Sequence, residues 1–216
     1  MKIFITRISL LVLILMIALS CTKIGKNITV KGRVLNPITG VGISGVEIKL
    51  LRSQNLQYNG GYKAIKKVVS DENGNYEINA TRLGPIYLIP GEIGQNYSLG
   101  FNYEGNYYSM KKVDKGKVMH IDYHLVPYGE YRIKINNINC QGTNDTLIIN
   151  QTNQTNSFLG VDWVLTGCDG YTTSWDKVPM GTIHTKYTVI RNGISNSFVE
   201  DFKVLPNQQN EQIINY

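Results

Sequence analysis

Apolar and polar side chains alternate along almost the whole chain after residue 21, and this alternation limits the fold more than any other feature. It is regular in Ile28–Val34, Val46–Leu50, Tyr97–Tyr103 and Met119–Leu125. Nowhere after residue 21 do apolar residues recur at i, i+3, i+4 and i+7 over three turns. Because successive side chains of a strand point to opposite faces, a period of two predicts half-buried strands. Short strands separated by Gly and Asn turns predict an all-β fold of antiparallel β-sandwiches.

Two turn signals and one boundary organise these strands. Asp71–Asn75 separates strands expected at Ala64–Ser70 and from Tyr76 onward, which predicts a hairpin. Asn192-Gly193 suits the positive φ angles of a type I′ turn and predicts a second hairpin. Pro127-Tyr128-Gly129 follows a full set of strands, so we place a domain boundary there.

The N-terminus has the parts of a secretory signal. Lys2 and Arg7 give it a positive start, and Ile8–Leu19 is an almost uninterrupted apolar run. The run is shorter than the roughly 20 apolar residues of a membrane-spanning helix, which favours a cleaved signal peptide. Ala18-Leu19-Ser20-Cys21 resembles the lipobox of bacterial lipoproteins, in which the cysteine thiol takes a diacylglycerol before cleavage. The alternative is ordinary cleavage, which leaves Cys21 free or disulfide-bonded.

The cysteine count agrees with lipidation. The chain has three cysteines, so Cys140 and Cys168 remain if Cys21 carries lipid. An exported chain meets an oxidising compartment, which predicts a Cys140–Cys168 disulfide within the second domain. The alternative is two buried free thiols.

These features divide the chain into five parts. A strand is expected at Tyr131–Ile138, and Gln141–Ser157 is predicted to be a long polar loop around a short strand, Thr146–Ile149. The parts are a lipoprotein signal peptide (1–20), a lipidated tether (21–27), a first β-sandwich (28–126), a second small β-sandwich domain (128–206) and a polar tail (207–216).

Residues 28–90 resemble the carboxypeptidase regulatory-like domain. The resemblance is carried by Gly32-Arg33-Val34, Thr39-Gly40, Ser44–Ile48 and Ser70–Tyr76, which have the order and spacing of that family. It implies a seven-stranded, transthyretin-like sandwich of a type common in exported Bacteroidetes proteins. Such domains are accessory modules in binding and assembly, so the resemblance implies a fold and leaves the ligand open. Residues 128–216 resemble no family that we can name.

Charge argues against a nucleic-acid partner. Loss of residues 1–20 takes away two of 22 basic residues and none of the 16 acidic ones, which leaves a formal charge of +4. The basic residues form only short pairs, Lys66-Lys67 and Lys111-Lys112. This pattern is typical of a solvated surface with weak attraction to anionic lipid.

No motif indicates catalysis, a metal or another cofactor. His120 and His124 lie about 13 Å apart along a strand, too far to share one ion with Asp122. The segment from Asp71 lacks the Gly at position six and the Glu at position twelve of a calcium loop, so we interpret it as a turn. Nucleophile-elbow, zinc-protease and phosphate-loop motifs are all missing from the sequence.

The sequence therefore favours a non-enzymatic envelope lipoprotein that presents a β-sandwich surface to a protein or glycan partner. Tyr107-Tyr108 and Trp175 are the candidate exposed aromatics for a sugar, the alternative being that they belong to the core. The other hypothesis is a hydrolase of polysaccharide or peptide with a carboxylate pair that only the fold brings together. Surface-exposed lipoproteins of such bacteria often carry an acidic run after the lipidated cysteine, whereas this chain has no acid before Glu47. Residue 22 is Thr and not the Asp associated with inner-membrane retention. The resemblance therefore implies an outer-membrane anchor with the domains facing the periplasm.

Overall fold

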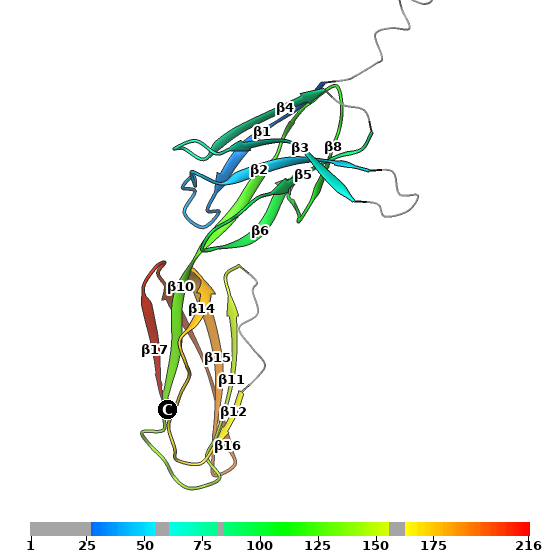
Figure 1. Cartoon of the computed structure of the whole chain (residues 1–216). Coiled ribbons are helices and arrows are strands. Elements are labelled where there is room, and N and C mark those ends of the chain that lie inside the picture. The colour runs from blue at the N-terminus through cyan, green and yellow to red at the C-terminus, as the bar shows by residue number, and fades with distance from the viewer. Residues whose placement is uncertain (1–26, 55–60, 82–83, 156–162) are drawn as a thin grey trace, which may run out of the picture.

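The computed structural model describes residues 27–54, 61–81, 84–155 and 163–216. Within these ranges every regular element is a β-strand, so the predicted all-β fold is confirmed (Figure 1). The buried apolar residues form two clusters, one drawn from residues 28–125 and the other from residues 131–216. The parts of the chain around these clusters are the first and the second domain.

The first domain packs two sheets face to face. Its strands are β1 (Asn27–Leu35), β2 (Glu47–Ser53), β3 (Tyr62–Val69), β4 (Asn75–Thr81), β5 (Ile86–Pro90), β6 (Asn96–Tyr103), β7 (Asn106–Tyr108), β8 (Lys111–Val113), β9 (Val118–His120) and the start of β10 (Asp122–Asn136). One sheet has the order β4-β1-β10-β6-β7, with β9 also paired to β1, and the other has the order β3-β2-β5-β8. Val30, Ile48, Leu88 and Tyr123 are among the side chains buried between them.

The second domain is also built from two sheets. Its further strands are β11 (Thr146–Asn153), β12 (Trp163–Thr166), β13 (Tyr171–Thr172), β14 (Asp176–Pro179), β15 (Gly181–Arg191), β16 (Ile194–Val204) and β17 (Gln209–Asn215). One sheet places β10 between β17 on one side and β13 and β14 on the other. The other sheet has the order β12-β11-β15-β16.

Strand β10 belongs to both domains and runs from one into the other (Figure 1). It is 15 residues long and pairs with β1 and β6 in the first domain and with β13, β14 and β17 in the second. The sequence predicts that one strand ends at Pro127 and that another begins at Tyr131, and this prediction is wrong. Pro127 lies opposite Asn96, the first residue of β6, so its missing N–H falls where the β6 ladder ends. Its carbonyl accepts a hydrogen bond from the Met180 amide at 2.8 Å.

The predicted polar tail at 207–216 is a second difference, because Gln209–Asn215 form β17, parallel to β10. Its inward-facing residues are Asn210, Gln212 and Ile214, all of them buried. Two of the three are polar, so the sequence of β17 does not show the alternation of apolar and polar residues from which the other strands are predicted. Their side chains nevertheless have hydrogen-bond partners. Asn210 Nδ2 donates to the Glu130 carbonyl at 3.0 Å, and Gln212 Oε1 accepts from the Tyr131 hydroxyl at 2.8 Å.

Strand β11 is longer than the predicted Thr146–Ile149 for the same reason. It continues to Asn153 and buries Gln151 and Asn153. Asn153 Nδ2 donates to the Pro179 carbonyl at 2.8 Å, which compensates for its loss of water. Much of the predicted loop from Gln141 is therefore strand, and residues 156 and 157 lie outside the described ranges.

The two predicted hairpins have different outcomes. Asn192 and Gly193 adopt φ angles of 49° and 77°, and β15 pairs with β16 on either side of them, so this hairpin is confirmed. Asp71–Asn75 does form a turn, but β3 pairs with β2 and β4 pairs with β1. The turn therefore carries the chain from one sheet to the other, and the predicted hairpin between its flanking strands is wrong.

Candidate functional site

The second domain is open on one side near its distal end, the end farthest from the first domain. A groove of about 240 Å³ lies there, between strands β15 and β16 and the end of the chain. Alternate residues of β15 and β16 face it, because directly paired residues of antiparallel strands point to the same side of the sheet. The lining residues are Asn139, Tyr187, Val189, Arg191, Asn196, Phe198, Asn215 and Tyr216.

An aromatic pair forms the apolar wall of the groove. Tyr187 on β15 is paired with Phe198 on β16, and their rings stack with centroids 5.1 Å apart. Tyr187 is buried, whereas the Phe198 side chain is 46% exposed. Burial and a hydrogen bond to Glu200 raise the pKa of Tyr187 to about 12, and its hydroxyl donates to Glu200 Oε1 at 2.8 Å. The exposed Phe198 ring is free to pack against a ligand.

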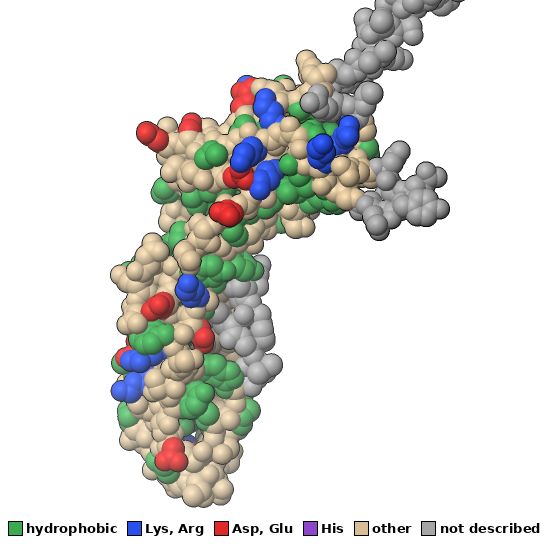
Figure 2. All heavy atoms as spheres, viewed as in Figure 1, with side chains coloured by type: hydrophobic (Ala, Val, Ile, Leu, Met, Phe, Trp, Pro, Cys, Tyr) green, Lys and Arg blue, Asp and Glu red, His purple; other side chains and the backbone are tan. Residues whose placement is uncertain are grey.

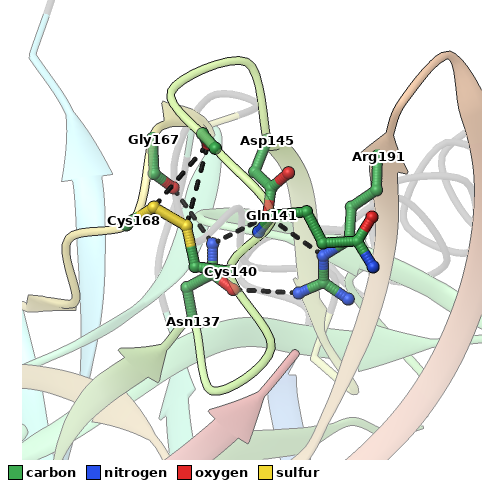
Figure 3. The surroundings of a disulfide bond; sticks show 8 residues. Asn137, Cys140, Gln141, Asp145, Gly167, Cys168 and Arg191 are labelled. Carbon is green, nitrogen blue, oxygen red and sulfur yellow. Dashed lines mark hydrogen bonds and ion pairs between the residues drawn. A yellow bond between two sulfur atoms is a disulfide. The ribbon is translucent and has the colours of Figure 1, made fainter.

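A partly buried ion pair between Arg191 and Asp145 lies at the distal end of the groove (Figure 3). Asp145 Oδ2 accepts hydrogen bonds from Arg191 Nε at 3.1 Å, from the Gln141 backbone N–H at 3.0 Å and from Asn137 Nδ2 at 3.2 Å. These donors, with the Gln141 amide first, hold the pKa of Asp145 below its ordinary value. Arg191 also donates to Asn137 Oδ1 at 2.9 Å, so its guanidinium is held at two points.

A disulfide fixes the loop that supplies these groups. Cys140 follows β10 and is bonded to Cys168, which follows β12, and their Cα atoms lie 5.3 Å apart. The predicted pairing is confirmed. Asn137 Nδ2 also donates to the Gly167 carbonyl at 3.1 Å, which links the same two loops a second time (Figure 3). The distal tip is therefore cross-linked by a covalent bond and by hydrogen bonds.

The end of the chain forms the opposite wall of the groove. The Tyr216 carbonyl accepts hydrogen bonds from the Ile138 and Asn139 amides at 2.7 and 3.3 Å, and the Tyr216 amide donates to the Asn136 carbonyl at 3.0 Å. The Tyr216 ring is buried, with its centroid 5.4 Å from the Arg191 guanidinium. Backbone hydrogen bonds thus hold this wall in place.

The residues considered as metal ligands, His120, Asp122 and His124, do not contact one another in the structure but lie in separate environments. His120 is exposed at the end of β9, and Asp122 Oδ1 accepts from the Arg33 amide at 2.8 Å. His124 Nδ1 lies 2.7 Å from the Tyr107 hydroxyl, and burial lowers the pKa of this histidine. The described ranges contain no group of three His, Cys, Asp or Glu residues that could hold a metal ion.

The carboxylates that share one surface depression of the first domain are Asp71, Glu77 and Asp122. Glu77 forms an ion pair with Lys31 at 2.9 Å, and Asp71 accepts hydrogen bonds from Asn75. The Asn75 side chain lowers the pKa of Asp71, and Lys31 lowers that of Glu77. A glycosidase acid needs a raised pKa, and neither Asp71 nor Glu77 has one.

The aromatics proposed from the sequence as a sugar platform all contact other side chains, although Tyr107 remains 49% exposed. The Tyr107 ring packs edge-on against His124, and Lys111 Nζ lies 4.0 Å from the centre of the Tyr108 ring. Trp175 is half-buried beneath the Arg132 guanidinium, which lies 4.3 Å from the ring centre. Phe198 is the exposed aromatic that lies beside a groove.

Sequence reasoning identified none of the groove residues as functional. One signal was present, since Phe198 and Val199 are adjacent apolar residues in a strand and must point to opposite faces. Cys21, the predicted lipidation site, lies outside the described residues. Among the residues that are described, no helix is long and apolar enough to cross a membrane.

The fold and the groove define the class: an all-β protein of two β-sandwich domains with a shared strand.

No protein-family model and no curated protein matches the sequence. Among solved structures, the chain is similar to the Bacillus anthracis TIE protein, with 18% identity over 88% of this chain and 33% of that chain and a TM-score of 0.32. A streptococcal ancillary pilin matches with 13% identity over 87% and 62% and a TM-score of 0.33. The shaft pilin spaA from Lactobacillus rhamnosus GG matches with 9% identity over 88% and 97% and a TM-score of 0.31.

The chain spans less than two thirds of the length of the first two of these structures. At TM-scores near 0.3, none of the three carries an inference about what this chain does.

Proposed function

We propose that the chain is a non-enzymatic accessory module of the bacterial cell envelope, anchored by lipid on Cys21, that binds a protein or glycan partner through the groove of its second domain. The observation that carries the binding part is the groove itself. It has an exposed aromatic ring on one wall and amide side chains from Asn139, Asn196 and Asn215 around it. Amides and an aromatic face are groups that bind either a polypeptide or a sugar.

The arrangement of the two domains supports tethering at the N-terminus. Strand β1 begins at Asn27, at the end of the first domain that lies away from the second (Figure 1). A tether of residues 22–27 reaches at most roughly 20 Å, so the first domain would lie near the bilayer. The groove would then lie at the far end of the molecule, where a partner can approach it.

We place the anchor in the outer membrane with both domains in the periplasm. This placement depends on the lipobox resemblance and on the lack of acidic residues between Cys21 and Glu47. The Cys21→Ala variant is expected to leave the membrane fraction or to remain uncleaved, and protease added to intact cells should leave the wild-type domains undigested. Unchanged processing and membrane fractionation of the variant would exclude lipidation, and digestion from outside would place the domains on the cell surface.

Binding is tested with a matched pair of groove and control variants. Phe198→Ser removes the exposed ring of the groove, and Val164→Ser removes a 60% exposed apolar side chain from β12, on the opposite edge of the same sheet. After cross-linking in intact cells, the partner should be recovered with the wild type and with Val164→Ser but not with Phe198→Ser. Equal recovery with all three chains would show that the groove is not the binding site.

A further inference from the structure

Strand β16 forms a long free edge beside the groove. All 11 of its residues pair with β15, and the register is unbroken from Ile194 to Val204. In the described part of the chain no strand pairs with its other side. Residues 194–199 are all exposed, Ile194 and Val199 at 66% and 68%, so the residues that the structure describes leave these side chains uncovered.

The hairpin geometry identifies which backbone groups of β16 are unpaired. In a two-residue type I′ hairpin the flanking residues, here Arg191 and Ile194, exchange both backbone hydrogen bonds. Because hydrogen-bonded and non-hydrogen-bonded pairs alternate in an antiparallel ladder, every second residue after Ile194 also bonds to β15. The N–H and C=O groups of Ser195, Ser197 and Val199 therefore point away from the sheet.

The distal half of β16 lacks the features that protect edge strands in soluble proteins. Such edges are usually short, interrupted or charged. Edge strand β3 carries Lys63, Lys66 and Lys67, and edge strands β7 and β12 have three and four residues. Residues 194–199 contain no charge, no proline and no register shift.

The free edge continues directly into the groove. Asn196 and Phe198, two residues of this half of β16, line the groove, and their side chains face the other sheet. A strand added to the edge would place its own alternate side chains on this same face. One of them would lie against the Phe198 ring and partly close the open side of the domain.

We infer that the edge formed by residues 194–199 accepts an extended segment of a partner protein as a fifth strand of this sheet. This inference rests on the proposed function and specifies the partner of the groove as a polypeptide. Only another backbone supplies donors and acceptors that match a strand edge residue by residue. The segment has an apolar side chain opposite Phe198. A basic side chain beyond it would lie near Glu200 and Asp201, which are exposed but already contact the Tyr187 hydroxyl and the His184 ring.

Charge supports a basic or neutral partner segment. Residues 128–216 contain six Lys and Arg against eight Asp and Glu. In the space-filling view the Lys and Arg side chains gather mainly over the first domain, while the second domain presents few of them (Figure 2).

A second copy of this chain fits the edge less well than a different protein does. Two copies paired antiparallel through β16 would be related by a two-fold axis and would point in opposite directions along this strand. Their first domains, and with them the two proposed anchors, would then lie at opposite ends of the dimer. Both anchors could not enter the same membrane.

The test uses a phage-displayed library of random dodecapeptides selected on the purified full chain. Val199→Pro removes one outward N–H without removing a bond to β15, and Val199→Thr keeps that N–H. Enriched peptides should show apolar alternation and should bind Val199→Pro roughly tenfold or more weakly than both the wild type and Val199→Thr. Circular dichroism and tryptophan fluorescence establish whether each variant is folded.

Amide hydrogen exchange keeps the test valid even if Val199→Pro fails to fold. In the free wild-type chain the Ser195, Ser197 and Val199 amides should exchange quickly, and a bound synthetic peptide should protect all three. Protection elsewhere, or no enriched peptide, would overturn the inference. Binding on a glycan array that depends on Phe198 but not on the Val199 amide would overturn it while supporting the proposed function. A dimer that Val199→Pro abolishes would assign the edge to a second copy and would also overturn it.

Discussion

A buried polar network holds β17 onto the core of the second domain, and Tyr131→Phe tests its contribution. The Tyr131 hydroxyl donates to Gln212 Oε1 at 2.8 Å and accepts from Gln151 Nε2 at 2.7 Å. Gln151 Nε2 also donates to Thr185 Oγ1 at 2.9 Å. All four residues are buried between the two sheets, so water cannot replace a lost partner.

The expected cost follows from the number of hydrogen bonds lost. Tyr131→Phe removes two bonds but leaves Gln151 and Gln212 with Thr185 as a remaining partner. At a net contribution of about 0.5 to 1.5 kcal/mol per bond, the free energy of unfolding should fall by about 1 to 3 kcal/mol. For a domain of this size the Tm should fall by roughly 4 to 8 °C for each kcal/mol.

The assay can be made specific for the second domain, because both tryptophans of the chain, Trp163 and Trp175, lie there. Urea unfolding followed by tryptophan fluorescence should show a lower midpoint for Tyr131→Phe than for the wild type. Tyr171→Phe is the matched control, since Tyr171 is 48% exposed in the same domain. If the two variants unfold within about 0.5 kcal/mol of each other, the network does not stabilise the domain as argued.

The same variant should change the response to alkaline pH. Burial raises the pKa of Tyr131 to about 12, whereas a tyrosine in an unfolded chain titrates near 10. The unfolded chain therefore releases its proton first, and the stability contributed by this group is complete below pH 10 and is lost as the pH rises toward about 12. Tyr131→Phe should show a shallower loss of stability across that range.

Two further substitutions test other parts of the fold. Replacing Cys140 and Cys168 together by Ser opens a link across a sequence separation of 28 residues, which should cost about 3 to 4 kcal/mol in the same urea assay and make the chain insensitive to reductant. Gly32→Ala would place a methyl group on the Ile121 carbonyl and separate β1 from its neighbours. Calorimetry should therefore show a first domain destabilised by about 1 to 3 kcal/mol or more. Gly61→Ala should be neutral, because no atom of the described residues lies within 4 Å of the added Cβ.

The strands that the sequence predicted are those whose inward side chains are apolar. Met119–Leu125 is an example, because Met119, Ile121, Tyr123 and Leu125 are all buried in the core, although the structure divides this segment at Ile121 into β9 and the start of β10. Strand β17 and the second half of β11 were missed because Asn210, Gln212, Gln151 and Asn153 occupy their inward positions. Each of these amides is hydrogen-bonded, so burial is possible without an apolar side chain. Which amide finds a partner depends on strands far apart in the sequence.

Of the candidate site, the sequence predicts only the disulfide, because that prediction depends on the number of cysteines. If the third cysteine carries lipid, as we propose, the two that remain predict a disulfide, and the structure contains the Cys140–Cys168 bond. The groove depends instead on which strands lie at the edges of the two sheets. No local pattern contains this information, because edge position is decided by the order of strands within each sheet.

The unequal widths of the two sheets explain why the groove is open. In the second domain the sheet around β10 has β17 as its last strand on the groove side, and the facing sheet extends through β15 to β16. Gln212 of β17 contacts Thr185 on the inward face of β15, and Phe202 in the proximal half of β16 packs against Tyr131 of β10. Phe198, in the distal half of β16, remains exposed. A sandwich in which half of one strand is uncovered can be completed either by a strand on its own sheet edge or by a ligand over the exposed ring. The unpaired amides of β16 distinguish these two cases, because a bound strand must protect them from exchange and a ligand that contacts only the ring leaves them open to solvent.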